Sequence, residues 1–286
     1  MPELPELEIV QDVLTRHLLD QTLTEVKVLP PGGILVVRDL THSGFESTLA
    51  GRSLQEIRRR GKFLLFSFDS LGVFETLGES RLYLVINPKL SGRLQLTDPA
   101  SKRLPRTFIL FTFANGRQLR YLDQKQMGQV YLTHSLDPVP DYTSLGPEPF
   151  DLSLEQFRER IKRFTGEIKG ILTRGDLVAG IGNAYADEIL WAARIHPYRK
   201  RPSLTPEEVE RLYVSIQSTL KEAIEKVRQG MGENIHSEPR GFMAVHMKAG
   251  QPCPRCGTRI SQVGANQRIT NFCRTCQPGG LIEGMG

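Results

Sequence analysis

The last forty residues contain the feature that most restricts how this chain can fold. All four cysteines of the 286-residue sequence lie there, as Cys253-x2-Cys256 and Cys273-x2-Cys276, with sixteen residues between the pairs. Two such knuckles supply four thiolates in the closed tetrahedral arrangement of a structural zinc site. We therefore predict one structural Zn²⁺ per chain, held in a hairpin. A pair of disulfides is the alternative, but it needs an oxidising compartment, and the sequence shows no signal peptide.

The other end of the chain suggests a nucleophile. The sequence begins with Met1-Pro2-Glu3, and removal of Met1 would leave the secondary amine of Pro2 free. An α-amine titrates near ~8, so a useful fraction is unprotonated at neutral pH and can attack a sugar carbon to form an iminium. Glu3 is then placed to move protons. The simpler interpretation is that Pro2 only begins a helix, where its missing N–H costs nothing.

Hydrophobic periodicity divides the first half into one helix and several strands. Apolar residues at spacings of three and four predict an N-terminal helix, and these are Leu7, Val10, Val13, Leu14 and Leu18. Runs of aliphatic and aromatic residues predict strands over 62–68, 81–86, 107–113 and 118–122, with Asn115-Gly116 as a hairpin turn. We expect a β-rich domain, built as a two-sheet sandwich. The stretch 69–80 is longer than a simple hairpin connection requires.

Helical patterns dominate the second half. Four prolines within 137–149 indicate an extended linker. Thr205 and the residues after it combine an N-cap, a first-turn proline and a capping-box glutamate, which predicts a helix whose apolar face continues to Val227. The segment 180–183 indicates a tight turn that ends in an N-cap asparagine, Asn183, before a helix over 184–193. Such a helix start presents free N–H groups to an anion.

The predicted fold class is α+β and multidomain. It comprises an N-terminal helix with a β-sandwich, a helical domain and a four-cysteine zinc-finger hairpin. The predicted boundaries are 1–136 for the N-terminal domain, 137–149 for the linker, 150–249 for the helical domain with a loop at about 231–248, 250–277 for the zinc finger and 278–286 for a flexible tail.

The charge of the chain suits a nucleic-acid partner. The formal net charge is +5 and the isoelectric point is about 9.1, with basic clusters at 58–62 and 199–201. A basic surface supplies the sequence-independent part of DNA affinity, although a charge run is also typical of any solvated face. No apolar run is long enough to cross a bilayer. We expect a monomer in the cytoplasm, at the bacterial nucleoid, with no membrane partner.

Three motifs in the same order resemble one family. The chain is similar to the formamidopyrimidine-DNA glycosylase and endonuclease VIII family of base-excision repair enzymes, and closer to the first branch. The resemblance rests on Pro2-Glu3-Leu4-Pro5-Glu6, on Gly180-Ile181-Gly182-Asn183-Ala184-Tyr185-Ala186-Asp187-Glu188, and on Gln267-Arg268 with Thr270 between the cysteine pairs. It implies a helix–two-turn–helix element in the helical domain and damaged double-stranded DNA as the partner.

The resemblance also implies roles for individual residues. Pro2, Glu3 and Lys62 would form the catalytic group, and Glu6 would lie near the base pocket. Lys62, Lys169, Asn183 and Arg268 would contact DNA phosphates. Each has a simpler alternative: Lys62 as a solvated strand-edge lysine, Asn183 as a helix cap, and Glu6 as a first-turn glutamate favoured by the helix dipole.

The sequence departs from the family pattern where the extruded base is replaced. Where the family has His-x-Gly-Met-Ser-Gly, this chain has Asn-Pro-Lys-Leu-Ser-Gly at 87–92. Where the family has Asp-Pro-Arg followed by an Arg-Phe pair, this chain has Asp-Gln-Lys-Gln-Met-Gly at 123–128. Leu90 and Met127 remain apolar and would fill the void in the stack, whereas Gln126 replaces an arginine. The preferred lesion and opposite base therefore stay open.

The function implied is a bifunctional DNA glycosylase and abasic-site lyase. It would remove oxidised bases through a Schiff base on Pro2, followed by β,δ-elimination. Two alternatives remain: an abasic-site lyase or binder that does not excise oxidised bases, and a zinc-containing DNA-binding protein without catalysis.

Overall fold

The computed structural model describes residues 1–69, 81–264 and 269–279. Arg268 and nearly all of the 69–80 stretch lie outside these ranges. The chain forms two compact units, one of residues 1–144 and 227–239 and one of 145–226 and 240–286. The domain boundaries given above stay a prediction.

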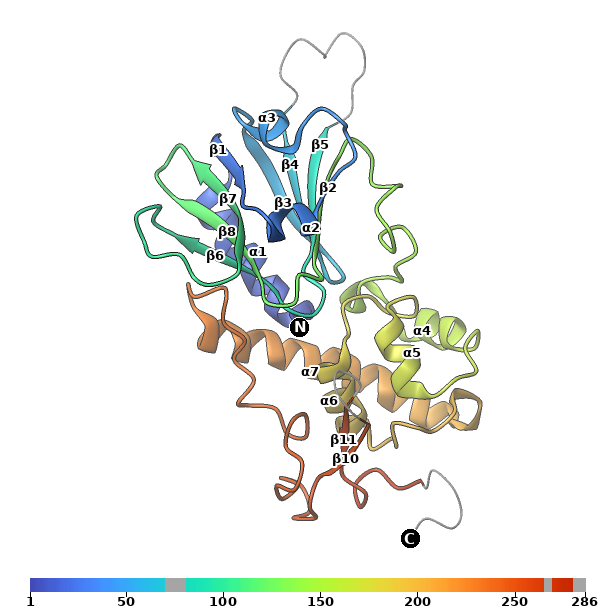
Figure 1. The fold of residues 1–286 in the computed structure, drawn as a ribbon. Coiled ribbons are helices and arrows are strands. Elements are labelled where there is room, and N and C mark those ends of the chain that lie inside the picture. Colours follow the sequence, from blue (N-terminus) through green and yellow to red (C-terminus); the bar gives the residue numbers. More distant parts are fainter. Residues whose placement is uncertain (70–80, 265–268, 280–286) are drawn as a thin grey trace. The chain divides into compact units, whose positions relative to one another are not determined.

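The first unit consists of two antiparallel-rich sheets and helix α1 (Figure 1). α1, Leu4–Leu18, buries its apolar stripe against β3 and β4. The five-stranded sheet has the order β2 (Val37–Asp39), β9 (Gln129–Thr133), β5 (Leu82–Asn87), β4 (Phe63–Phe68), β3 (Leu54–Arg60), and only the β2–β9 pair is parallel. The four-stranded sheet has the order β1 (Leu23–Val28), β7 (Thr107–Phe113), β8 (Gln118–Asp123), β6 (Gly92–Thr97). Short helices α2 (Gly32–Val36) and α3 (Phe45–Leu49) lie between strands.

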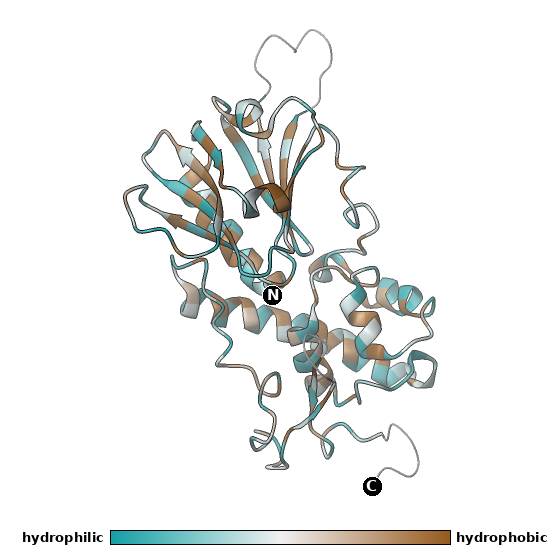
Figure 2. Cartoon of the chain, viewed as in Figure 1, coloured by the Kyte–Doolittle hydropathy of each residue, from teal (hydrophilic) through white to brown (hydrophobic). Residues whose placement is uncertain are grey.

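Continuous apolar strands explain why two sheets form. Every residue of β4 and every residue of β8 is buried, so both faces of these strands are covered. Hydrophobic and hydrophilic residues alternate along several other strands and along α7 (Figure 2). The predicted strands are confirmed to within one residue at each end, and the two-sheet architecture is confirmed.

The second unit is helical and ends in a small hairpin. Its elements are the single-turn helix η2 (Pro149–Asp151), α4 (Leu154–Ile161), α5 (Ile168–Arg174), α6 (Asn183–Ala193), the single-turn helix η3 (Arg201–Ser203), α7 (Pro206–Met231), β10 (Ser261–Val263) and β11 (Thr270–Phe272). The last residues of α7, from Val227, belong to the first unit. No helix in the described ranges is both long and apolar enough to cross a bilayer.

The structure confirms one helix cap and corrects another. Thr205 forms the predicted capping box, since its hydroxyl accepts from Glu208 N at 3.3 Å and its own N–H donates to Glu208 Oε2 at 3.0 Å. The prediction that Asn183 is an N-cap is wrong. Gly182 occupies that position and Asn183 is the first helical residue, because the Asn183 amide is used elsewhere, as described below.

Candidate active site and metal centre

The proposed catalytic terminus is built into the start of α1. Glu3 is the N-cap residue with 1% of its surface exposed, and its N–H donates to Glu6 Oε2 at 2.9 Å. Pro5 lies within the first turn, where a missing N–H costs nothing. Carboxylates at this end are favoured by the helix dipole. Glu6 therefore lies in the first turn and completes a capping box with Glu3, which directly follows the buried Pro2.

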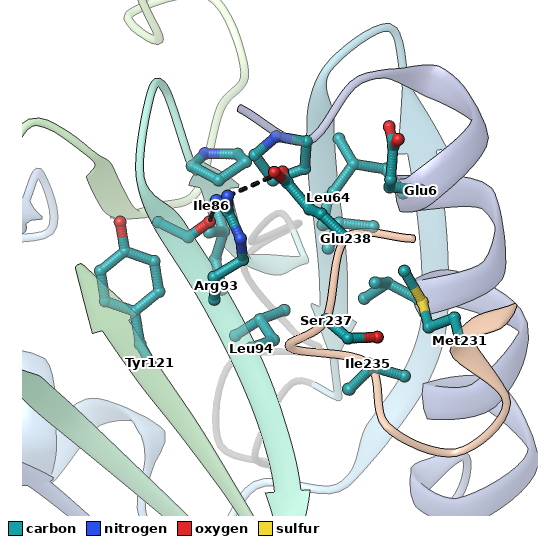
Figure 3. A pocket seen from close by; sticks show the side chains of 15 residues that line it. Glu6, Leu64, Ile86, Arg93, Leu94, Tyr121, Met231, Ile235, Ser237 and Glu238 are labelled. Atoms are coloured by element: carbon teal, nitrogen blue, oxygen red, sulfur yellow. Dashed lines mark hydrogen bonds and ion pairs between the residues drawn. The ribbon is translucent and has the colours of Figure 1, made fainter. Parts of the chain in front are cut away.

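A pocket in the first unit joins this terminus to the segment after α7 (Figure 3). Pro2 and Glu6 line one side, and Met231 to Glu238 line the other. Arg93 binds Glu238 at 2.7 Å, and the Met1 amine lies 3.4 Å from the same carboxylate. The free space is about 20 Å³, enough for about one water, so a nucleobase does not fit this pocket in the described conformation.

Lys62 lies directly before β4, and its charge interacts with the carboxylate of Glu3. Burial lowers the pKa of Lys62 from its ordinary value, while the Glu3 carboxylate raises it and Lys89 lowers it further. The structure therefore brings together Glu3 and Lys62, two residues separated by 59 positions. It also adds Lys89, which sequence reasoning did not assign.

The two predicted void-filling turns are held to one buried carboxylate. Asp123 accepts from Lys125 N at 3.2 Å and from Gly128 N at 2.7 Å, and it also accepts from the Ser91 hydroxyl. Ser91 Oγ in turn accepts from Lys125 N at 2.9 Å. The turn that carries Leu90 and the turn that carries Gln126 and Met127 are thus fastened together at the ends of β5 and β8.

The side chains in these turns differ in exposure. Met127 is 50% exposed, and Gln126 has a positive φ of 55°. Leu90 is half-buried. An exposed apolar side chain next to a rigid turn suits insertion into a base stack.

In the second unit, Lys169 lies in a buried polar network. Its Nζ lies 2.6 Å from Asp187 Oδ1 and donates to Thr270 Oγ1 at 2.9 Å and to Ile269 O at 3.0 Å. Asn183 Nδ2 donates to the same Ile269 carbonyl at 2.8 Å. Both predicted phosphate-binding residues therefore meet at the residue that follows Arg268, which itself lies outside the described ranges.

Asp187 and Glu188 extend this network, and the sequence analysis gave them no role. Asp187 also accepts from Asn271 N at 3.1 Å and lies 2.9 Å from His246 Nδ1. Glu188 accepts three backbone N–H groups, from residues 244, 245 and 246, at 2.8 to 2.9 Å. The two acids stand side by side in the quoted 180–188 motif. That adjacency was a usable signal, but apart from Lys169 their partners lie more than fifty residues away.

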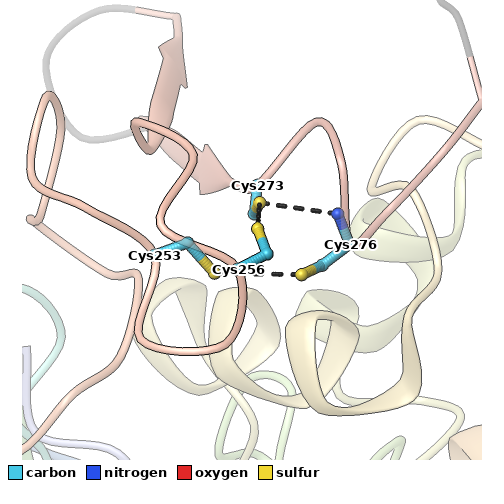
Figure 4. A group of neighbouring side chains, drawn as sticks. All are labelled: Cys253, Cys256, Cys273 and Cys276. Atoms are coloured by element: carbon cyan, nitrogen blue, oxygen red, sulfur yellow. Dashed lines mark hydrogen bonds between the residues drawn. The ribbon is translucent and has the colours of Figure 1, made fainter.

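The four cysteines gather at one point, as Figure 4 shows. Their sulfur atoms all lie within 4.8 Å of one another, with Cys253–Cys276 at 3.8 Å and Cys256–Cys273 at 3.4 Å. A disulfide requires about 2.05 Å, whereas tetrahedral Zn–S bonds of about 2.3 Å place sulfurs about 3.8 Å apart. Hydrogen bonds from Thr258 lower the pKa of Cys256 to about 6, which favours a thiolate ligand. The cysteines therefore fit one structural Zn²⁺, and no disulfide joins them.

The zinc knuckles are fastened to α6. Trp191 Nε1 donates to Cys253 Sγ at 3.4 Å, and the Arg255 guanidinium lies 4.0 Å from the Trp191 ring centroid. Gln277 bridges Cys273 N and Ile195 O, each at 2.9 Å. The metal site therefore positions the β10–β11 hairpin, in which Ile269 and Thr270, at the start of β11, bind Lys169 and Asn183.

Three family models match successive parts of this chain. Residues 1–130 match the formamidopyrimidine-DNA glycosylase N-terminal domain, 145–234 match the H2TH domain of that enzyme, and 250–279 match a zinc finger found in FPG and IleRS. The chain belongs to the formamidopyrimidine-DNA glycosylase family. Its members are N-glycosylases and abasic-site lyases of base-excision repair.

Individual relatives support this membership. The formamidopyrimidine-DNA glycosylase of Symbiobacterium thermophilum is 37% identical, over 97% of this chain and 90% of the relative. That of Pelotomaculum thermopropionicum is 35% identical, over 97% and 99%. Among solved structures, MutM in complex with DNA containing carbocyclic 8-oxo-G is 29% identical with a TM-score of 0.82, and Lactococcus lactis Fpg bound to DNA with an abasic site is 30% identical with a TM-score of 0.79. Both alignments cover 97% of this chain and 100% of the other.

Proposed function

We propose that Pro2 is the nucleophile of this glycosylase and lyase. After Met1 is removed, the Pro2 nitrogen attacks C1′ of the flipped nucleotide and the damaged base leaves. Cleavage of the C1′–O4′ bond, with a proton taken up by O4′, then opens the sugar ring to an iminium, which acidifies the C2′ proton. Loss of that proton expels the 3′ phosphate by β-elimination, and a second elimination releases the 5′ phosphate.

Glu3 is the proposed acid–base group at the sugar. A carboxylate in this role contributes on the order of 10²–10⁴-fold. The observation that carries the proposal is the burial of Glu3 directly after Pro2, in the electrostatic neighbourhood of Lys62. Lys62 is the proposed cation for the phosphate beside the lesion.

Asn183, Lys169 and Arg268 are the proposed contacts of the second unit with the DNA backbone. The shared bond to Ile269 O supports Asn183 as a positioned amide next to Arg268. Lys169 stays a prediction as a DNA contact, because Asp187 and Thr270 already hold its ammonium group.

The proposed substrate is double-stranded DNA that carries an oxidised or ring-opened purine. This class follows from the names of the relatives and of the ligands in the similar structures, which include 8-oxo-G and Fapy-dG. Leu90 and Met127 are the proposed void-filling residues, and Gln126 lies where an arginine would contact the orphaned base. Such an enzyme works on the chromosome, so we place it in the bacterial cytoplasm at the nucleoid.

The Glu3→Gln variant tests the assignment. It should bind lesion duplex with wild-type affinity but excise the base about 10²–10⁴-fold more slowly. Glu25→Gln, on the half-exposed Glu25 of β1, is the matched control and should leave the rate unchanged. Wild-type excision by a folded Glu3→Gln protein would overturn the role of Glu3.

An abasic-site lyase without base excision is the second candidate. The replacement of arginine by Gln126 favours it, because void filling is needed to extrude an intact lesion. Parallel assays on an 8-oxoguanine duplex and on a preformed abasic site distinguish the two. Cleavage of the abasic duplex alone would select the second candidate.

A further inference from the structure

Lys89 lies near Lys62, where β4 begins and β5 ends within the five-stranded sheet. Leu64 of β4 pairs with Ile86 of β5 in antiparallel register. Continuing this register by two residues, back along β4 and forward along β5, places Lys62 opposite Pro88, the neighbour of Lys89. The contacts of residues 141–142 agree with this placement. The Tyr142 ring lies 5.4 Å from that of Phe63, and Asp141 Oδ2 lies 3.7 Å from Lys89 Nζ.

The backbone at Lys89 disfavours a side chain. Its φ is +47°, in the left-handed region that glycine adopts without steric cost. The turn imposes this angle, since Gly92 N donates to Pro88 O at 2.9 Å and Lys89 N donates to Asn87 Oδ1 at 3.2 Å. A lysine retained at such a strained position suggests that its positive charge has a function.

The charges around Lys89 point to an anion as its ligand. The two ammonium groups repel each other, and the positive charge of Lys89 contributes to the lowered pKa of Lys62. The pair with Asp141 is weak, because that carboxylate is 72% exposed and 3.7 Å away. A phosphodiester bound between Lys62 and Lys89 would relieve the repulsion between the two lysines.

We propose that Lys89 is a second phosphate-binding cation of the active site, acting beside Lys62 on the DNA backbone next to the damaged nucleotide. The turn that carries Lys89 also carries Leu90, so a phosphate contact at Lys89 would set the position of the void-filling side chain. This inference rests on the proposed function.

The test is the salt dependence of binding to a duplex with a tetrahydrofuran abasic analogue, which has no base to excise. Lys89→Gly should bind about 3–10-fold more weakly near 0.1 M salt, and the slope of log affinity against log salt should be shallower by ~0.9, the value for one phosphate. Its Tm should equal or exceed that of the wild type by about 1–3 °C, because glycine suits the positive φ. Lys89→Arg should keep the wild-type slope.

Lys102→Ala is the control, since Lys102 is an exposed lysine in the β6–β7 connection. It should change neither slope nor affinity. A Lys89→Gly protein with the wild-type slope, or a Lys89→Arg protein as weak as Lys89→Gly, would overturn the inference. Failure of the wild type itself to prefer the tetrahydrofuran duplex over undamaged DNA would instead contradict the proposed function.

Discussion

Lys62 and Lys169 are both predicted phosphate contacts, yet the two units treat them in opposite ways. Lys169 lies 2.6 Å from a fully buried Asp187 and donates to two oxygens of the β11 region. Lys62 is placed where burial and Lys89 lower its pKa, with Glu3 acting in the opposite direction. Burial and the neighbouring Lys89 disfavour the charged form of Lys62, whereas the Lys169–Asp187 pair is buried, so that loss of either partner would leave an uncompensated charge. We infer from this contrast that Lys62 serves the chemistry and Lys169 the framework.

Zinc removal should give the largest effect, and it should act on the surroundings of Lys169 and not on those of Lys62. A chelator should unfold the β10–β11 hairpin and release Lys169 and Asn183 from Ile269, because structural zinc contributes folding free energy directly. Trp191, the only tryptophan of the chain, touches Cys253 and therefore reports on this region. Its fluorescence should change on chelation and recover when Zn²⁺ is added back. Unchanged Trp191 emission after complete zinc loss would contradict the framework role.

Lys169→Met should be the most destabilising substitution of the two lysines. It leaves Asp187 buried without its cation, and breaking such a pair costs about 3–5 kcal/mol of unfolding free energy. The double variant Lys169→Met with Asp187→Asn should recover much of the loss, since no charge is then left unpaired. Denaturant titration followed by Trp191 fluorescence measures both. A single variant as stable as the wild type would remove the distinction between the two lysines.

Lys62→Met should have the opposite signature. Affinity for the tetrahydrofuran duplex should fall about tenfold with the loss of one phosphate contact, while Tm should stay the same or rise by about 1–3 °C. Because the folded-state pKa of Lys62 is lowered, folding disfavours its charged form at neutral pH. That cost disappears as pH rises through the folded-state pKa towards 10.5, so the stability gap to Lys62→Met should narrow at high pH. A loss of stability at neutral pH would show that Lys62 is structural.

The sequence predicted the parts of this molecule that local patterns determine. The β4 and β7 strands are continuous apolar runs, the start of α7 has a capping box, and the zinc site has a fixed spacing; all are confirmed. The N-cap prediction at Asn183 failed because the Asn183 side chain is engaged in a long-range bond, from its NH2 group to Ile269 O, which local sequence does not reveal.

The electrostatic arrangement of the site could not be predicted in the same way. Arg93 binds Glu238 across 145 positions, and Lys89 acquires its importance from a turn angle and from the β4–β5 register. Both depend on long-range packing. Asp123 resembled part of a family stretch in sequence, yet its function as the common acceptor of two turns appears only in three dimensions.

The central claim is that the nucleophile is the Pro2 nitrogen. The most direct measurement is borohydride reduction of the protein during reaction with duplexes that carry an abasic site or 8-oxoguanine, followed by mass spectrometry of the adduct. The account predicts a chain without Met1 and a covalent DNA adduct on Pro2 with both duplexes. A chain without Met1 that forms no adduct, or an adduct mapped to a lysine such as Lys62, would contradict it.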